Sequence, residues 1–283
     1  MKTALVLEGG GMRGMYTAGV IDALMDMDVH FDAIMGVSAG ALFGMNYKSR
    51  QRGRVLRYNL KYIGDKRYMG FHSFLTTGDL MNRKFCFEDI VYHLDPVDFK
   101  TFDNSPEEFY AVVTNLDTGE AEYIRIDDLE ADMEYLRASG SLPFVSHSVE
   151  INGKRYLDGG IADSIPIAKI MEMGFEKVLV VLTRPAGYRK KKSGGTFARI
   201  VYHKHKKFAN AFNTRYITYN NQLDLVDKCV KNGMAIVLQP SEYIKTGRIE
   251  KDKEVLKKLY NLGLKNAMEN KEKITDFFGE ISR

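Results

Sequence analysis

Two short apolar stretches, each of which turns through glycines and continues into a helical pattern, constrain the fold of this chain most strongly. The first is ALVLEGGGMRGM at residues 4–15, and the second is FDAIMGVSAG at residues 31–40. Two strand–turn–helix units in succession place both turns at one edge of a parallel sheet, where the carboxyl ends of the strands gather. We therefore predict an α/β fold with a mainly parallel central sheet.

The second turn, Gly36-Val-Ser38-Ala-Gly40, has the spacing of a nucleophile elbow. Gly36 and Gly40 allow the strand and the following helix to lie close together, while the serine sits on a sharp turn with its hydroxyl exposed. The helical pattern at residues 39–48 places the positive end of a helix dipole beside that hydroxyl. We expect Ser38 to be a nucleophile.

The first turn offers backbone N–H groups at the start of a helix, an arrangement that suits an anion. The anion formed when a serine attacks an acyl group is one candidate, so we expect an oxyanion hole at Gly9, Gly10, Gly11, Met12, Arg13 and Gly14. The same residues fit the Gly-x-Gly-x-x-Gly pattern of dinucleotide-binding proteins. That pattern needs an acidic residue at the carboxyl end of the second strand, but Asp32 precedes the strand and Ser38 follows it. A nucleotide cofactor is thus the weaker alternative.

The composition is that of an ordinary soluble globular protein, with 45% hydrophobic and 28% charged residues among 283. No apolar run approaches the roughly 20 residues that cross a bilayer. The apolar residues before Glu8 are too few for the core of a signal peptide. Cys86 and Cys229 form neither a disulfide framework nor a metal-binding spacing. We expect a cytoplasmic protein.

Positive charge is concentrated in residues 184–207, although the net charge of the chain is only +4. The segment contains Arg189-Lys-Lys-Lys192 and His203-Lys-His-Lys-Lys207. It is either a solvated loop and helix face or a surface attracted to an anionic membrane, where each cation contributes on the order of 1 kcal/mol. No nucleic-acid-binding module surrounds these charges, so we predict no nucleic-acid partner.

Hydrophobic periodicity and turn residues predict the remaining elements. Residues 51–95 are the least regular part, and we interpret them as a helical insertion near the active-site edge, either a plain helical layer or a lid. Beyond it we expect strands at 109–114, 121–126, 149–151, 154–157, 177–183 and 234–239, and helices at 129–138, 164–173, 216–230 and 251–278.

A third motif, Asp158-Gly159-Gly160, follows the hairpin that Asn152-Gly153 predicts. A serine hydroxyl is a poor nucleophile until a base takes its proton. None of the six histidines stands in a glycine-framed turn after a strand, whereas Asp158 does, and its two glycines leave room for close approach to another loop. Taken alone, the motif is better explained as a plain turn.

Together the three motifs resemble the patatin-like phospholipase family, whose pattern is a Gly-Gly-Gly-x-Arg-Gly loop, a Gly-x-Ser-x-Gly elbow and an Asp-Gly-Gly or Asp-Gly-Ala motif. The resemblance extends over about residues 3–166 and includes Ala138-Ser-Gly-Ser-Leu-Pro143. It departs from the family at Asp163-Ser164, because many members carry asparagine there. The resemblance implies a three-layer α/β/α fold and hydrolysis of acyl esters by a Ser-Asp dyad, without histidine, metal or cofactor.

The resemblance also implies a role for each motif. Ser38 would attack the acyl carbonyl, and Asp158 would take its proton and later activate water. Arg13 would brace the glycine loop, and the N–H groups that hold the oxyanion would be those around Gly10, Gly11 and Met12. The substrate would be a phospholipid or another acyl ester, and the basic segment would contact an anionic membrane peripherally.

Two alternatives remain open. A hydrolase with a histidine-containing triad would use His147, which precedes the hairpin and could reach the same edge, whereas a lipid-binding protein would keep the fold without turnover. We expect a single hydrolase domain over residues 1–283, with the motifs in 1–183 and the basic segment, last strand and amphipathic helix in 184–283. The methionines near the motifs either line an acyl slot or fill the core: Met12, Met15 and Met45. The sequence specifies neither the head group nor the oligomeric state.

Overall fold

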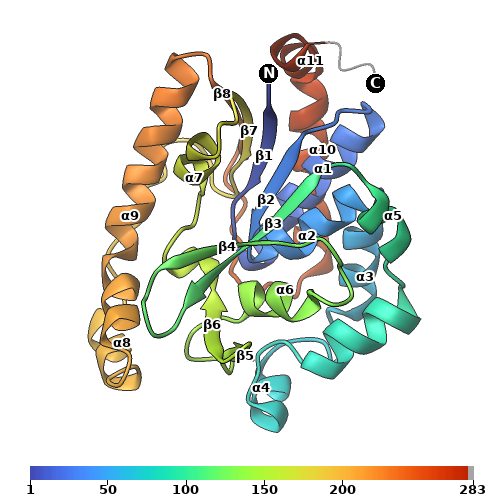
Figure 1. Cartoon of the computed structure of the whole chain (residues 1–283). Helices are drawn as coiled ribbons and strands as arrows, with labels where there is room; N and C mark the ends of the chain where they lie inside the picture. Colours follow the sequence, from blue (N-terminus) through green and yellow to red (C-terminus); the bar gives the residue numbers. More distant parts are fainter. Residues whose placement is uncertain (280–283) are drawn as a thin grey trace.

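The chain folds around one eight-stranded sheet that helices cover on both faces (Figure 1). The structure is a computed structural model, and it describes residues 1–279. The strands are β1 (Thr3–Leu7), β2 (Ala33–Val37), β3 (Glu108–Asn115), β4 (Ala121–Arg125), β5 (Val149–Ile151), β6 (Lys154–Asp158), β7 (Lys177–Val181) and β8 (Ala235–Leu238). They lie in the order β5-β6-β3-β2-β1-β7-β8, and β4 pairs with β3 outside this path.

The sheet is mainly parallel, as predicted. Neighbours in the series β3-β2-β1-β7-β8 run parallel, whereas β4, β5 and β6 pair antiparallel. In the β3–β6 pair, Asp158 lies opposite Val113, near the carboxyl end of β3. The antiparallel pairing therefore delivers the end of β6 to the edge of the sheet where β1 and β2 also end.

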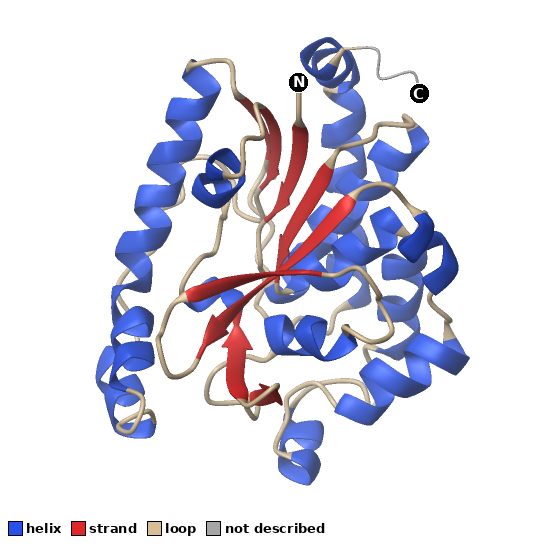
Figure 2. Cartoon of the chain, viewed as in Figure 1, coloured by secondary structure: helices blue, strands red, loops and turns tan. Residues whose placement is uncertain are grey.

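Helices form a layer on each face of the sheet (Figure 2). They are α1 (Met15–Asp26), α2 (Ala39–Lys48), α3 (Arg54–Tyr62), α4 (Phe71–Thr77), the π-helix η2 (Phe85–Leu94), α5 (Phe99–Asn104), α6 (Met133–Gly140), α7 (Ile167–Glu172), α8 (Gly195–Val201), α9 (Lys206–Lys231), α10 (Lys253–Glu269), α11 (Lys271–Phe278) and the short 3-10 turns η1 (Gly11–Gly14) and η3 (Gly159–Ile161). The expected three-layer α/β/α fold is confirmed. Within residues 1–279, no helix has the length and apolar composition that a bilayer crossing requires.

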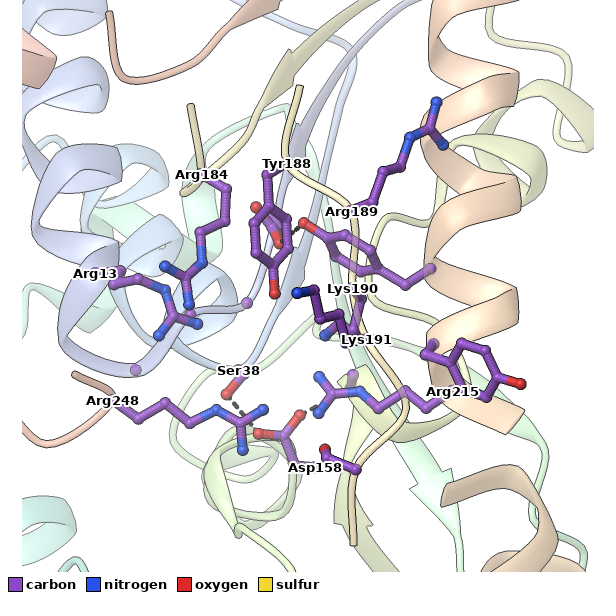
Figure 3. A pocket seen from close by; sticks show the side chains of 18 of the residues that line it. Arg13, Ser38, Asp158, Arg184, Tyr188, Arg189, Lys190, Lys191, Arg215 and Arg248 are labelled. Carbon is purple, nitrogen blue, oxygen red and sulfur yellow. Dashed lines mark hydrogen bonds between the residues drawn. The ribbon is translucent and has the colours of Figure 1, made fainter. Parts of the chain in front are cut away.

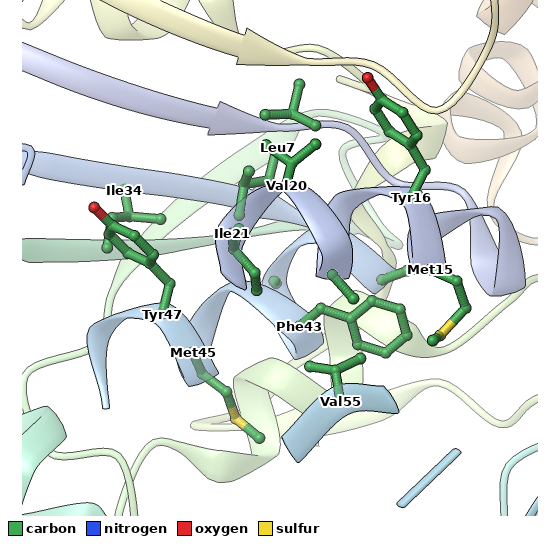
Figure 4. Packing of buried hydrophobic residues seen from close by; sticks show 14 of the residues in the cluster. Leu7, Met15, Tyr16, Val20, Ile21, Ile34, Phe43, Met45, Tyr47 and Val55 are labelled. Atoms are coloured by element: carbon green, nitrogen blue, oxygen red, sulfur yellow. The ribbon is translucent and has the colours of Figure 1, made fainter. Parts of the chain in front are cut away.

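The central strands are buried on both faces because their side chains alternate between two hydrophobic cores. Leu5 and Leu7 of β1 join the core that contains α1, α2 and α10. Ala4 and Val6 join the core that contains α7 and α9. Figure 4 shows the first core, in which side chains of α1 and α2 pack onto Leu7 and the sheet.

All four helices predicted beyond residue 95 differ from their predicted bounds, and the one predicted at 164–173 is shorter, spanning Ile167–Glu172. The helix predicted at 129–138 begins at Met133, because the chain before it turns and the Asp128 carboxylate accepts the N–H of Ala131 at 2.9 Å. The helix predicted at 216–230 begins already at Lys206. Its first turn is basic, but it also contains Phe208, whose buried side chain packs this turn onto the rest of the protein. The helix predicted at 251–278 is two helices that meet at Asn270. Such local side-chain and backbone turns leave no periodic signal in a sequence.

Helices α1 and α10 cross with their backbones in contact. A Cβ atom on Gly19 would lie 1.9 Å from the carbonyl oxygen of Tyr260, and one on Gly263 would lie 2.0 Å from that of Tyr16. The hydroxyl of Tyr260 also donates to the buried Asp22 carboxylate at 2.6 Å. The two glycines therefore set the separation of the helices and join the end of the chain to its first strand–turn–helix unit.

We predict that Gly19→Ala and Gly263→Ala each destabilise the protein, because the added methyl group must push the two helices apart. Overpacking of this kind typically costs about 1–3 kcal/mol. Chemical denaturation followed by circular dichroism measures the loss. Gly64→Ala is the matched control, since no atom lies within 4 Å of the Cβ position of Gly64. Wild-type stability of Gly19→Ala would contradict a backbone-to-backbone crossing.

Candidate active site

Ser38 occupies the sharp turn between β2 and α2. Its φ angle of +78° lies in a region that residues with side chains rarely adopt, and such strain costs about 1–3 kcal/mol. Close packing maintains the turn, because a Cβ on Gly36 would lie 2.6 Å from the Cα of Ala41 and one on Gly40 would lie 2.3 Å from the carbonyl oxygen of Leu7. The turn has the geometry of a nucleophile elbow.

The side chains of Ser38 and Asp158 meet directly. The Ser38 hydroxyl donates to Asp158 Oδ2 at 2.7 Å (Figure 3), and the two residues are 7% and 3% exposed. The other carboxylate oxygen accepts the N–H of Gly160 at 2.7 Å, and the N–H of Asp158 donates to the carbonyl of Ser141 at 2.8 Å. Both carboxylate oxygens are thus fixed, and one of them is positioned to take the serine proton.

Ser139 supports the elbow from beneath. Its hydroxyl accepts the N–H of Ser38 at 2.9 Å and donates to the carbonyl of Val112 at 2.7 Å, and the residue is fully buried. The hydroxyl therefore ties the strained turn to β3. The sequence contained a signal for this residue, since the stretch from Ala138 to Pro143 belongs to the family pattern, but nothing in the stretch predicted this contact.

The Asp163-Ser164 pair, which departs from the family pattern, is well accommodated. Asp163 accepts from the hydroxyl of Tyr123 at 2.7 Å and from the side chain of Gln222 at 2.6 Å, although burial raises the pKa of its carboxyl. Ser164 donates to the carbonyl of Gly160 at 2.8 Å, so it supports the loop behind the dyad instead of capping the next helix. That helix, α7, begins at Ile167 rather than at residue 164.

The glycine loop follows β1 and ends in the 3-10 turn η1. Gly11 has a φ angle of +58°, and a Cβ there would lie 2.6 Å from the carbonyl oxygen of Arg248. The N–H of Met12 donates to that same carbonyl at 3.0 Å, so this donor, expected in the oxyanion hole, is already engaged. Within residues 1–279, the N–H groups of Gly10 and Gly11 have no protein acceptor. These two N–H groups are therefore free to bind an anion.

The other glycines of the three motifs are close-packed. A Cβ atom at any of four of them would fall no more than 2.9 Å from a neighbouring atom: Gly9, Gly10, Gly14 and Gly159. None of these positions has room for a side chain, which explains why glycine fills them.

None of the six histidines lines the pocket around Ser38. The best candidate, His147, has a side chain that is 68% exposed and faces Asp79, with 3.3 Å between its Nδ1 and the carboxylate. The structure therefore gives a histidine-containing triad no geometric support. In the described part of the chain, no cluster of histidine, cysteine or carboxylate side chains could hold a metal ion.

The pocket above the dyad has a volume of about 610 Å³ and an unusually basic wall (Figure 3). Apolar and aromatic groups, among them Leu142, Phe212 and Tyr216, form part of it. Seven cationic side chains also line it: Arg13, Arg184, Arg189, Lys190, Lys191, Arg215 and Arg248. The first part of the basic segment thus lines the pocket and does not face only solvent or a membrane. Arg215 and Arg248 also line the pocket, although they come from parts of the chain that contain no recognised motif.

Burial and mutual repulsion lower the pKa of three of these basic side chains. Burial, together with Arg215, lowers the pKa of Lys190 to about 6. Burial, together with Arg184, lowers the pKa of Arg13 to about 10, and burial together with Arg248 lowers that of Arg215 to about 10. An anion inside the pocket would relieve this repulsion.

The pocket wall departs from one expectation, the role of Arg13, and distinguishes between the alternatives left open for residues 51–95 and for the methionines. The side chain of Arg13 points into the pocket and its buried Nε has no partner, so it does not brace the glycine loop. No residue of 51–95 lines the pocket, and α3 and η2 contribute buried side chains to the main core as a plain helical layer. The methionines proposed for an acyl slot also belong to that core: Met12, Met15 and Met45.

Two family profiles and several known proteins match this chain. The profile of the patatin-like phospholipase family matches residues 5–170, and that of a domain of unknown function, DUF6363, matches residues 205–279. The uncharacterized protein YjjU of Escherichia coli is 30% identical over 191 residues, which are 65% of this chain and 53% of that protein. Lysophospholipase NTE1 of Phaeosphaeria nodorum is 29% identical over 200 residues, which are 64% of this chain and 12% of that protein.

The chain therefore spans about half the length of YjjU and about an eighth of the length of the fungal lysophospholipase. Among solved structures, VipD from Legionella pneumophila aligns with 96% of this chain and 67% of its own, with a TM-score of 0.46 and 12% identity.

We predict that Ser139→Ala lowers both stability and the reactivity of Ser38. The substitution leaves the Ser38 N–H and the Val112 carbonyl without their partner, and each buried unsatisfied group costs about 1–3 kcal/mol. Thermal unfolding and the rate of labelling by a fluorophosphonate probe measure the two effects. Ser141→Ala is the control, because its hydroxyl only returns to the carbonyl of Arg137 while its own carbonyl, which holds Asp158, stays. Equal labelling of Ser139→Ala and wild type would show that the elbow holds without this contact.

Proposed function

This chain belongs to the patatin-like phospholipase family, and we propose that it is a lipid acyl-ester hydrolase of the phospholipase A, lysophospholipase or esterase type. One observation carries the proposal: the buried hydrogen bond of 2.7 Å from Ser38 to Asp158 at the mouth of a pocket. That distance falls in the range of about 2.6–3.2 Å that direct proton transfer needs. Fungal relatives named as lysophospholipases support the same class.

The reaction we propose has two steps. The Ser38 oxygen bonds to the acyl carbon while Asp158 takes the hydroxyl proton, and the N–H groups of Gly10 and Gly11 bind the resulting oxyanion. The bond to the alcohol then breaks, and the alcohol leaves with the proton from Asp158. In the second step water attacks the acyl carbon while Asp158 takes one of its protons, the bond from the acyl carbon to the Ser38 oxygen breaks, and Ser38 receives that proton from Asp158 as the fatty acid leaves. The N-terminus of α2, at Ala39, adds its partial positive charge beside the reacting oxygen.

We also propose that residues 1–283 work as one hydrolase domain. The pocket wall combines Arg13 from the first motif with Arg215 from α9 and Arg248 from the loop before α10. The carbonyl of Arg248 holds the N–H of Met12. Residues after 183 thus complete the site that the three motifs begin.

Finally, we propose that α8 rests on an anionic membrane surface beside the pocket. Phe197 and Ile200 are 57% and 65% exposed, and Arg199 and Lys204 are exposed beside them. Phe144 links α8 to the pocket, because its ring centroid lies 5.0 Å from that of Phe197 and 5.1 Å from that of the pocket residue Phe212. Exposed apolar side chains among cations are typical of a helix that binds the lipid interface. The cytoplasmic location expected from the composition stays a prediction.

For membrane contact, we predict that Ile200→Glu weakens binding to vesicles of anionic phospholipid. The substitution removes an isoleucine side chain that would be buried in the lipid interface and adds one negative charge. The partition coefficient between vesicle and water should therefore fall by on the order of tenfold. Sedimentation with vesicles at low salt measures this. Met268→Glu, at an exposed position on α10, places the same charge elsewhere and should bind as the wild type does. If both variants bind equally, α8 is not the contact.

For the catalytic base, we predict that Asp158→Asn folds and loses almost all ester hydrolysis, because the amide has nearly the same shape but cannot accept the serine proton. His147→Gln should fold and keep most of the activity, since the histidine lies outside the pocket. Hydrolysis of a soluble short-chain ester and labelling of Ser38 by a fluorophosphonate measure both. The opposite pattern would replace the dyad by a histidine-containing triad.

A further inference from the structure

The basic wall of the pocket is not explained by ester hydrolysis alone. An acyl chain requires an apolar wall, and the dyad and glycine loop together supply the nucleophile, the base and the oxyanion donors. Yet four separate segments bring cations to this place: η1, the loop after β7, α9 and the loop before α10. Burial, and after it the charge of Arg215, lowers the pKa of Lys190 to about 6, so the charged form of this lysine is unfavourable here without an anion.

The protein itself does not neutralise the central cations of this wall, which we call the cation cluster: Arg13, Arg184, Lys190, Arg215 and Arg248. In the described part of the chain, none of them has a carboxylate within 4.0 Å, whereas Arg189 at the rim pairs with Asp224 at 2.6 Å. The Nε atoms of Arg13 and Arg215 are buried without a hydrogen-bond partner. Donors are therefore left over inside the pocket.

The two carboxylates in the pocket are already occupied by other partners. Glu8 accepts from the N–H and hydroxyl of Thr183 at 2.6 and 3.0 Å and from the hydroxyl of Tyr219 at 2.8 Å. Asp158 accepts from Ser38 and Gly160. The four arginines of the cluster thus outnumber the two carboxylates of the pocket, and an anion beside them would also favour the protonated form of Lys190.

The cation cluster lies next to the reacting atoms. Arg215 and Asp158 both lie close to Gly160. A Cβ atom placed on that glycine would be 3.0 Å from Arg215 Nη2 and 3.1 Å from Asp158 Oδ1. Figure 3 shows Arg248 and Arg215 on either side of the dyad and Lys190 above it. An anion held by these side chains would therefore lie beside an ester whose carbonyl carbon is in contact with Ser38.

We propose that the cation cluster is a subsite for a phosphomonoester dianion, which the substrate carries close to the acyl ester that Ser38 attacks. Guanidinium groups match phosphate oxygens in pairs, and several of them suit a group with two charges better than a carboxylate with one. A phosphodiester head group that ends in a quaternary ammonium would fit less well, because it would add its own positive charge to a pocket that is already rich in cations. The inference rests on the proposed function, and it narrows the substrate class to acyl esters of a phosphorylated alcohol.

The first experiment compares three soluble short-chain substrates with the same acyl group: lysophosphatidic acid, lysophosphatidylcholine and monoacylglycerol. The wild type should hydrolyse lysophosphatidic acid with a kcat/KM at least about tenfold above the other two, as expected for several charge-assisted hydrogen bonds. Equal values for all three would overturn the proposal. Equal values for both phosphate-bearing substrates would also overturn it, because the site would then not distinguish a phosphomonoester dianion from a phosphodiester with one negative charge.

The second experiment uses Lys190→Gln and Arg248→Gln, two substitutions at different sides of the cluster. Each should reduce the preference for lysophosphatidic acid over monoacylglycerol by about tenfold, mainly through KM. Lys192→Gln and Lys231→Gln are the matched controls, because these exposed cations lie outside the pocket and should keep the wild-type preference. Wild-type preference in both cluster variants would place the phosphate elsewhere.

A third measurement separates failure of the subsite from failure of the proposed hydrolysis. Calorimetric titration of Ser38→Ala with inorganic phosphate and with glycerol phosphate requires no turnover, so it tests the cluster even if no ester is cleaved. Both should bind, and Arg248→Gln in the same background should weaken binding. Binding of inorganic phosphate without binding of glycerol phosphate would assign the site to the free ion and overturn the substrate assignment. Absence of binding by either would overturn the subsite while leaving the dyad intact.

Discussion

The hydrogen bond between Ser38 and Asp158 is the contact on which the arrangement of this protein depends. Ser38 directly follows β2 and Asp158 ends β6, and 2.7 Å separates their side-chain oxygens. To bring them together, the sheet must be parallel through β2 and β3 and must then accept β6 in the opposite direction. The hydroxyl of Ser139 accepts the N–H of Ser38, and the N–H of Gly160 donates to the Asp158 carboxylate, so each partner is held by a further hydrogen bond. The mixed sheet is thus the means by which a serine and a carboxylate meet without an intervening imidazole.

A buried carboxylate, Glu8, holds together the part of the molecule that carries the positive charge. It lies just after β1 and receives hydrogen bonds from Thr183, which follows β7, and from Tyr219 of α9. These three bonds offset the cost of burying the charge, and they join the glycine loop, the basic loop and the long helix at one point. Glu8 therefore holds together three of the backbone segments that carry the cationic wall.

Much of the fold and part of the candidate site could be predicted from the sequence because their signals are local. Glycine turns after apolar runs identified β1, β2 and the elbow at Ser38, and Asn152-Gly153 identified the hairpin before Asp158. Contacts between distant segments left no such signal. Arg215 and Arg248 reach the pocket only because α9 and α10 pack where they do, and the engagement of the Met12 N–H depends on a carbonyl far along the chain. Helix bounds failed where single side chains redirected the backbone, as at Asp128.

The bond from the Met12 N–H to the Arg248 carbonyl has a consequence for how such proteins can diverge. It makes the curvature of the glycine loop a property of a remote backbone segment, which belongs neither to the matched hydrolase profile nor to any catalytic motif. Changes in the length or sequence of that segment can alter turnover while every motif residue stays the same. Two proteins with identical motifs can therefore differ in rate and selectivity. Motif identity indicates the family, whereas the segment around Arg248 helps to set the shape of the glycine loop.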